Sequence, residues 1–103
     1  MAPGSDAIWK ALADSNRRDI LDRLKDGPRT TGDLCRSFRT SRFAVMKHLD
    51  VLADAGLVVG ERRGRDRWNH LSAVPLRLIE AWLGPFGGPG LGVAPVVEED
   101  WID

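Results

Sequence analysis

The sequence has no net charge, a single cysteine and no apolar run of about 18 residues, the length that a membrane-spanning helix needs. We therefore expect no segment that crosses a membrane and no membrane partner. Cys35 alone allows no intramolecular disulfide, which agrees with a reducing compartment. The first residues contain no basic segment followed by an apolar stretch, so no signal peptide is expected. We predict a cytoplasmic protein.

A chain of 103 residues, of which 43% are hydrophobic, is long enough for one globular domain with a modest core. It has little room for an enzyme with a separate cofactor domain, and a second subunit would help to stabilise it. The sequence shows no set of nucleophile, base and acid, and no glycine loop that would cradle phosphate. We expect no catalytic residues, no cofactor and no enzymatic activity.

The balance of 15 basic and 15 acidic side chains argues mildly against a nucleic-acid partner, provided that the charges are evenly spread. Counting by segment shows that they are not. Residues 1–28 carry five basic and five acidic side chains, residues 29–71 carry nine and five, and residues 72–103 carry one and five. The net charge of zero is therefore the sum of +4 on residues 29–71 and −4 on residues 72–103.

Capping residues, apolar periodicity and turn residues predict the order helix, helix, helix, turn, helix, β-hairpin, helix. The expected elements are helices over 5–13, from 15 to a stop at 27–28, over 32–38, over 42–55 and from 75 to about 83, with strands 57–63 and 67–71 around a turn at 64–66. Eight of the fourteen residues from 84 to 97 are Gly or Pro, so the last helix is expected to end before them. We predict a domain over 1–86 and a Gly/Pro-rich, then acidic, tail over 87–103.

The fourth expected helix has two distinct faces. At about 100° per residue, Val45, Leu49 and Leu52 fall within about 60° of one another and form a core stripe. The opposite face carries two cations, one acid and two apolar side chains with no obvious partner in the chain, namely Arg42, Lys47, Asp50, Phe43 and Met46. This outer face is the part of the helix that is available to a partner.

The element order is that of a winged helix-turn-helix, a mainly α fold with a small β-hairpin. In this fold the second helix of the pair enters the DNA major groove and the hairpin reaches along the backbone. The segment between Leu34 and Leu49 holds four cations and no acid, and the segment from Arg62 to Arg67 holds four more with one acid, which suits phosphate binding. We predict that double-stranded DNA is the partner and that the contacting residues are Thr40, Ser41, Arg42, Phe43, Met46, Lys47, Arg62, Arg63, Arg65 and Arg67.

Within this set, Arg42 is the best candidate for a guanine contact, and Phe43 or Met46 for a thymine methyl group. Ser41 is first a helix cap and second a phosphate contact. Two alternatives stay open: Phe43 packs against the third helix, or the hairpin arginines only keep the hairpin soluble and prevent edge pairing. The histidines and Cys35 are expected to be structural.

The last expected helix has two apolar sides. Leu76, Ile79 and Leu83 lie on one side, and Leu78 and Trp82 lie on nearly the opposite side. Two apolar sides need two neighbours, which we expect to be the core of this domain and a second subunit.

Three stretches of the sequence resemble the ArsR/SmtB family of bacterial winged-helix repressors: WKALADSNRRDIL at 9–21, GDL at 32–34 and SRFAVMKHLDVLADAGLV at 41–58. The arginine-rich hairpin and WLGPF at 82–86 extend the resemblance over about residues 7–86. It implies a homodimeric transcription factor, usually a repressor, that binds two operator half-sites. In the family the first and last helices form the dimer contact, which here implies Ile8, Trp9, Leu12, Leu78 and Trp82.

The resemblance is to members of the family that do not sense metals. Metal-sensing members carry a Cys-Val-Cys pair before the third helix, where this chain has Thr30 and Gly32, and one cysteine with two histidines cannot supply a four-ligand soft site. We expect no metal. Two alternatives remain: a regulator gated by the Cys35 thiol or by an unknown small-molecule effector in a pocket near the last helix, and a winged-helix module that binds protein. The arginines of the hairpin argue against the second.

Overall fold

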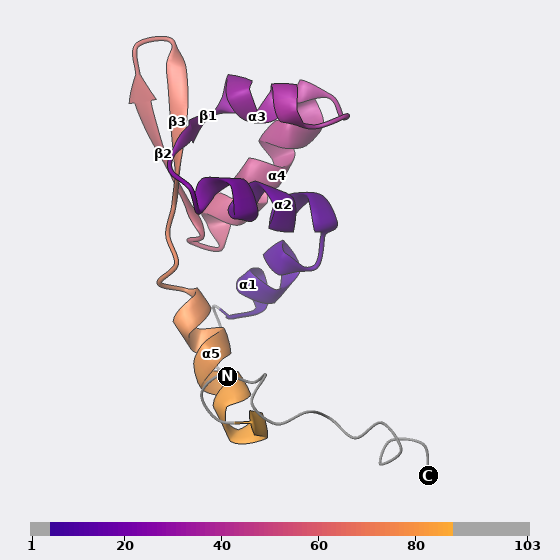
Figure 1. The fold of residues 1–103 in the computed structure, drawn as a ribbon, viewed down its shortest axis with the longest axis vertical. Helices are drawn as coiled ribbons and strands as arrows, with labels where there is room; N and C mark the ends of the chain where they lie inside the picture. Colours follow the sequence, from indigo (N-terminus) through magenta and orange to yellow (C-terminus); the bar gives the residue numbers. More distant parts are fainter. Residues whose placement is uncertain (1–4, 88–103) are drawn as a thin grey trace.

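A computed structural model describes residues 5–87 of the chain (Figure 1). The elements follow in the order α1 (Ser5–Leu12), α2 (Ser15–Leu24), β1 (Arg29–Thr30), α3 (Thr31–Ser37), α4 (Arg42–Asp54), β2 (Val58–Arg63), β3 (Asp66–Leu71) and α5 (Leu76–Gly87). This confirms the predicted winged helix-turn-helix, with α3 and α4 as the helix pair and β2–β3 as the wing. No helix within residues 5–87 is both long enough and apolar enough to cross a membrane.

The helices begin where short polar side chains satisfy the free N–H groups of the first turn. Asp14, Thr30 and Ser41 each accept a hydrogen bond from a backbone N–H two or three residues later, over 2.8–3.2 Å. Helix α4 ends at Asp54 with Ala55 as its C-cap, and Gly56 follows with a φ of +76°, the left-handed conformation that favours glycine. The predicted starts of α2 and α4 and the predicted end of α4 are therefore confirmed.

The core lies between α1–α4 and the base of the sheet. Val45, Leu49 and Leu52 of α4 have no exposed surface, which confirms the predicted core stripe. They pack with Ile20 of α2 and Leu34 of α3, which are equally buried. Because the stripe turns inward, the opposite face of α4 is held toward solvent.

The three strands form an antiparallel sheet in the order β1-β3-β2. The wing turns over Gly64 and Arg65, with Gly64 at a φ of +63°. Strand β1 is absent from the predicted fold, because two residues show no periodicity. It is fixed by the fully buried Asn69 of the neighbouring strand β3, whose Nδ2 donates to the Arg29 carbonyl over 3.2 Å and to Thr31 Oγ1 over 3.1 Å.

The prediction that the last helix stops before Gly84 is wrong, because α5 continues through Gly84 and Pro85 to Gly87. Pro85 lies in the last turn, where its missing N–H removes one helical hydrogen bond. Aromatic contacts hold this turn: the ring of Trp82 lies 4.9 Å from that of Phe86 and 5.5 Å from that of Trp9 on α1. The predicted tail, apart from Gly87, lies outside the described residues.

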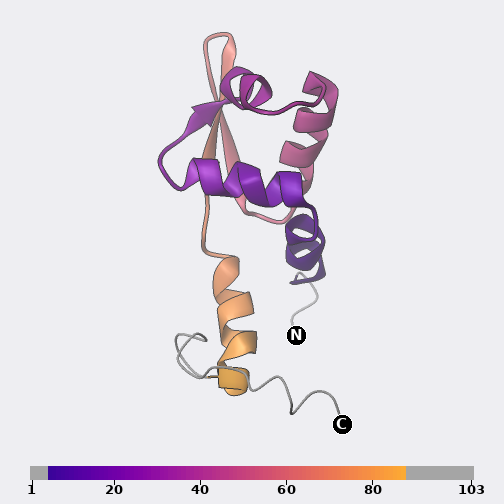
Figure 2. The same ribbon diagram turned by 45° about the vertical axis from the view of Figure 1, so that its right-hand side comes forward.

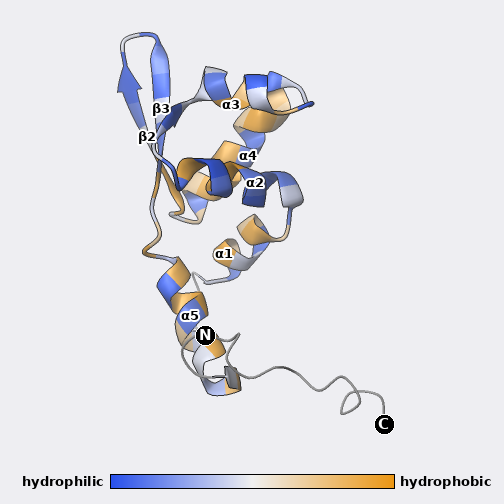
Figure 3. Cartoon of the chain, in the orientation of Figure 1, coloured by the Kyte–Doolittle hydropathy of each residue, from blue (hydrophilic) through white to orange (hydrophobic). Residues whose placement is uncertain are grey.

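The wing and α5 lie at opposite ends of the molecule in two views that differ by 45° (Figures 1 and 2). The tip of the wing is strongly hydrophilic, whereas α5 is largely apolar (Figure 3). Leu76 and Ile79 pack against the core, while Leu78 is 43% exposed and Trp82 is 46% exposed. Leu76 and Ile79 therefore face the core as predicted, and the opposite side, with Leu78 and Trp82, stays largely exposed apart from the aromatic contacts of Trp82.

Candidate nucleic-acid interface

The outer face of α4 exposes the side chains that the sequence assigned to it. Phe43 is 68% exposed and Met46 is 44% exposed, and Arg42 and Lys47 are exposed beside them. The Lys47 ammonium lies 4.9 Å from the centre of the Phe43 ring, a cation–π distance. The exposure of Phe43 disagrees with the alternative in which this ring packs against α3. Two apolar surfaces flanked by cations are thus presented together.

The turn between α3 and α4 adds further exposed groups. Thr40 and Ser41 are exposed, and the Ser41 hydroxyl accepts from the backbone N–H of Ala44 over 3.1 Å as the α4 cap. Arg39 is exposed and has no side-chain partner among the described residues. Its place in the four-cation segment was visible in the sequence, although the predicted contacts omit it. Arg36 is different, because it forms an ion pair with Asp33.

The four wing arginines fall into two classes. Arg62 and Arg65 are exposed and have no side-chain partner within residues 5–87. Arg63 pairs with Glu61, and its guanidinium lies 5.4 Å from the centre of the Trp68 ring. The hydrogen bond from Arg63 holds the pKa of Glu61 below its usual range, and Glu61 in turn raises the pKa of Arg63. Arg63 is therefore engaged inside the wing.

Arg67 is turned away from the wing surface. Only 33% of its side chain is exposed, and its Nη1 lies 3.9 Å from Oδ1 of Asp50 on α4. The guanidinium lies over Gly60 on the neighbouring strand. The sequence placed Arg67 correctly in the basic wing, but it contains no signal for the pairing with Asp50.

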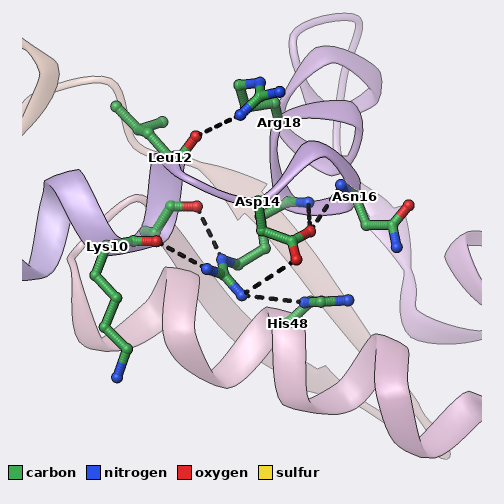
Figure 4. Close-up of polar contacts among 8 residues, drawn as sticks. Lys10, Leu12, Asp14, Asn16, Arg18 and His48 are labelled. Atoms are coloured by element: carbon green, nitrogen blue, oxygen red, sulfur yellow. Dashed lines mark hydrogen bonds and ion pairs between the residues drawn. The ribbon is translucent and has the colours of Figure 1, made fainter.

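The largely buried side chain of Arg17 contacts α4 on the side away from its exposed outer face. The side chain of Arg17 is 14% exposed, and it donates from Nε to the Ala11 carbonyl over 2.9 Å and from Nη2 to the Lys10 carbonyl over 2.8 Å. Its Nη1 lies 3.4 Å from Nδ1 of His48 on α4, beside the α2 cap Asp14, as Figure 4 shows for the labelled partners. Arg17 thus joins the end of α1 and the start of α2 to the inner side of α4. The sequence placed it on the apolar stripe of α2, without this role.

Asp14 has an altered acidity in this cluster. Burial acts to raise the pKa of Asp14, but the backbone N–H donors of Arg17 and Asn16, with the nearby charges of His48 and Arg17, lower it overall. The carboxylate is therefore stabilised in the charged form that caps α2.

The residues expected at a dimer contact lie in different environments. Ile8 is 2% exposed and belongs to the core of this subunit, so its side chain has almost no surface left for a partner. Leu12 is half-buried. Trp9 packs edge-on against Trp82, and both remain partly exposed beside Leu78. The α1–α5 surface formed by Trp9, Leu78, Trp82 and Phe86 is apolar and open.

The remaining candidates are a thiol, a cation site and a hollow. Cys35 is half-buried and packs against the core. Among the described residues no group of three or more His, Cys, Asp or Glu side chains is arranged to hold a metal ion. A hollow of about 370 Å³ lies where α1, α2, β3 and α5 meet, and its lining includes Leu12, Leu71 and Leu76.

Comparison with known proteins gives consistent matches. A helix-turn-helix domain model matches residues 12–61. The chain is 37% identical to the HTH-type transcriptional regulator Rv2034 of Mycobacterium tuberculosis, over 95% of this chain and 92% of that protein. It is 32% identical to the transcriptional repressor SdpR of Bacillus subtilis, over 81% of this chain and 92% of that protein.

A solved structure agrees with these relatives. The crystal structure of the ArsR family transcriptional regulator RHA00566 superposes with a TM-score of 0.77 at 35% identity, covering 82% of this chain and 89% of that one. Sequence and fold therefore lead to the same group of proteins, over 81–95% of this chain.

Proposed function

The chain belongs to the ArsR family of winged helix-turn-helix transcriptional regulators, and we propose that it is a homodimeric repressor that binds a pseudopalindromic operator. In this proposal α4 enters the major groove and the wing follows the backbone or the minor groove. The observation that carries it is the outer face of α4, where the apolar side chains of Phe43 and Met46 are exposed beside the cations Arg42 and Lys47. The protein would act in the cytoplasm, where its DNA is.

The side chains of α4 divide into base-reading and phosphate-binding groups. Arg42 lies at the N-terminal end of α4, which approaches base edges most closely, and is assigned to a guanine. Phe43 and Met46 are assigned to thymine methyl groups, because their exposed apolar surface suits that contact. Lys47 and Ser41 are assigned to phosphates. Thr40 completes the backbone contacts at the turn.

In the wing, Arg62 and Arg65 are assigned to the DNA backbone or the minor groove. Both are exposed and unpaired within the described residues, so their charges are available to phosphate. Arg65 lies at the turn, which is the part of the wing that reaches furthest from the core (Figure 1). Arg63 contributes through its pairing inside the wing.

The dimer is assigned to the apolar α1–α5 surface. Trp82 is 46% exposed and Phe86 is 71% exposed, and large aromatic side chains gain most from burial against a second copy. Because α5 lies at the end opposite the wing, a contact there leaves both copies of α4 free. Two such copies fit half-sites about one helical turn apart.

The test begins with sequencing the DNA fragments that the protein selects from its own genome, including the region upstream of its own coding sequence. Binding to a selected fragment is then measured over a range of salt concentrations. Arg42→Ala should cost about 1–3 kcal/mol and relax the sequence preference. Lys47→Ala and Arg65→Ala should weaken binding to all sequences and lower the salt slope by about one unit for each lost phosphate contact.

Arg77→Ala is the matched control, because it removes one exposed cation from α5, at the end away from the wing. Its affinity and salt slope should equal those of the wild type. If Lys47→Ala and Arg65→Ala also leave the slope unchanged, the proposed interface is wrong.

The hollow beside α5 supports a second candidate, a regulator released from DNA by a small molecule. Its lining combines four leucines with the polar or charged side chains of Ser15, Arg18, Asp19, Asp22 and Lys25, and it adjoins the start of α5, which continues into the proposed dimer contact. A set of small apolar compounds is tested for loss of operator binding, and an active compound should lose its effect in Leu12→Phe, which places a larger side chain in the lining of the hollow. A compound that acts equally on Leu12→Phe does not use this site.

A further inference from the structure

We propose that Arg67 is a positioning residue that fixes the wing against α4 through Asp50, and that it is not a phosphate contact. The proposal rests on the DNA binding proposed above. It changes the role of one of the four wing arginines, and it gives a role to two residues that had none, Asp50 and Gly60.

The strand register places Arg67 over Gly60. Gly60 pairs with Asn69 and Arg62 pairs with Arg67, so these residues share one face of the β2–β3 ladder. Asn69 is fully buried, and this face is therefore the one turned toward the core. An arginine at this position is directed toward α4, whereas Arg63 and Trp68 lie on the opposite face.

Gly60 provides the space for the guanidinium. A Cβ at position 60 would lie 2.6 Å from Nε of Arg67, 3.1 Å from Nη2 and 3.2 Å from Cζ. Any side chain larger than hydrogen would therefore push the end of Arg67 away from the strand. The clash involves the end of a flexible side chain, so a larger residue would move Arg67 while the strands stay paired.

Asp50 is the acid on the outer face of α4, one turn after Met46 and Lys47. Left alone, its carboxylate would repel DNA phosphates at the interface. Its Oδ1 lies 3.9 Å from Nη1 of Arg67, and this is the one ion pair between the wing and α4 within residues 5–87. The pair joins the two DNA-facing elements.

The wing needs such a connection because little else holds its upper part. Val58 is buried at the base of β2, whereas every residue of β2 after it is exposed. The angle between the wing and α4 is therefore set near the base by the core and higher up by Arg67. With the angle fixed, Arg62 and Arg65 reach the backbone at a defined distance from the groove that α4 occupies.

Neutralising Asp50 separates the two possible roles of Arg67, because they predict opposite signs. If Arg67 binds phosphate, Asp50→Asn releases it from a competing carboxylate and tightens DNA binding. If Arg67 positions the wing, Asp50→Asn loosens the wing and weakens binding, by about two- to fivefold from the range typical of exposed ion pairs. Asp54→Asn is the matched control, since it makes the same charge change at an exposed position of the same helix.

Two further variants complete the test. Gly60→Ala keeps every charge, displaces Arg67, and should weaken binding about as much as Asp50→Asn with an unchanged salt slope. Arg67→Gln should weaken binding without lowering the slope, whereas a lost phosphate contact lowers it by about one unit. The proposal is overturned if Asp50→Asn binds as tightly as Asp54→Asn or more tightly, if Gly60→Ala binds as the wild type does, or if Arg67→Gln lowers the slope.

A measurement without DNA separates this proposal from the proposed function. The ¹⁵N relaxation of arginine Nε–H groups in the full chain should show Arg67 ordered and Arg65 mobile, with Arg67 becoming mobile in Asp50→Asn. If the wild type binds no DNA, the proposed function fails and the relaxation data still decide the contact. If Arg67 is as mobile as Arg65 in the wild type, the contact does not exist.

Discussion

Replacing Arg17 with alanine should destabilise the fold far more than replacing its neighbour Arg18. Arg17 donates two hydrogen bonds to carbonyl groups at the end of α1, and its guanidinium also lies beside His48 and Asp14. Arg18 is exposed and donates one hydrogen bond, to the Leu12 carbonyl over 2.8 Å. Both arginines therefore donate hydrogen bonds to backbone carbonyl groups at the C-terminal end of α1. They differ in burial and in the number of partners.

The size of the effect follows from those contacts. A hydrogen bond to a charged group contributes about 1.5–3 kcal/mol, and truncation of Arg17 removes two of them from a site that is 14% exposed. Water reaches the freed carbonyls at the helix end and offsets part of the loss, so we expect a decrease of about 2–4 kcal/mol in the free energy of unfolding. Arg18→Ala, at an exposed site, should cost about 0.5–1 kcal/mol. Arg17→Lys should lie between them, since one ammonium cannot match both donors.

Urea denaturation followed by circular dichroism measures these differences. With a slope of about 1–3 kcal/mol per molar urea, a loss of 3 kcal/mol lowers the midpoint by about 1–3 M. All variants are compared at one protein concentration, because unfolding of a dimer depends on it. If Arg17→Ala and Arg18→Ala differ by less than about 0.5 kcal/mol, the Arg17 contacts do not stabilise the fold as argued.

Two further predictions concern a glycine and a carboxylate. Gly56→Ala should lower the free energy of unfolding by about 1–2 kcal/mol, because φ is +76° and the new Cβ would lie 3.3 Å from Pro75 Cγ. Gly84→Ala, in α5 with no atom within 4 Å of the new Cβ, should be neutral or stabilising in the same urea denaturation experiments. The pKa of Asp14 is lowered from 3.8, so the stability it contributes is present above that value and is lost as the pH falls through the lower folded pKa. Asp14→Asn, which keeps a capping side chain, should therefore show a smaller loss of stability than the wild type between about pH 5 and pH 2, and an equal loss would contradict the assignment.

Local signals in the sequence were enough to predict most of the fold. Asp14, Ser41 and Gly56 act within one turn of their own positions, so the starts of α2 and α4 and the end of α4 were predictable. Strand β1 depends on the buried amide of Asn69, about forty residues away in the chain. The extension of α5 through Pro85 places Phe86 against Trp82, which itself packs against Trp9 of α1. Both features come from tertiary contacts, which periodicity does not contain.

The sequence was enough to predict which residues lie at the candidate site, but not which of their side chains form ion pairs. The α4 stripe assigns Arg42, Phe43 and Met46 to the outer face, because a helix that buries one face must expose the other. Strand alternation could have placed Arg63 and Arg67 on opposite faces of the wing, but not their pairing with Glu61 and Asp50. The ion-pair partner of each arginine depends on which element packs next to its face of the wing, and the sequence does not give that packing.

Those pairings explain how a chain with no net charge can present a basic surface. In the segment 29–71, Asp33, Glu61 and Asp50 are each matched by one arginine, namely Arg36, Arg63 and Arg67. These three acids are thus paired inside the subunit, whereas Asp54 and Asp66 stay exposed, and the exposed cations of the segment include Arg39, Arg42, Lys47, Arg62 and Arg65. Counterion release depends on the cations that meet phosphate and not on the charge of the whole chain. The three paired arginines therefore act by removing negative charge from the DNA-facing side, so the proposed affinity depends on them even if none of them touches DNA.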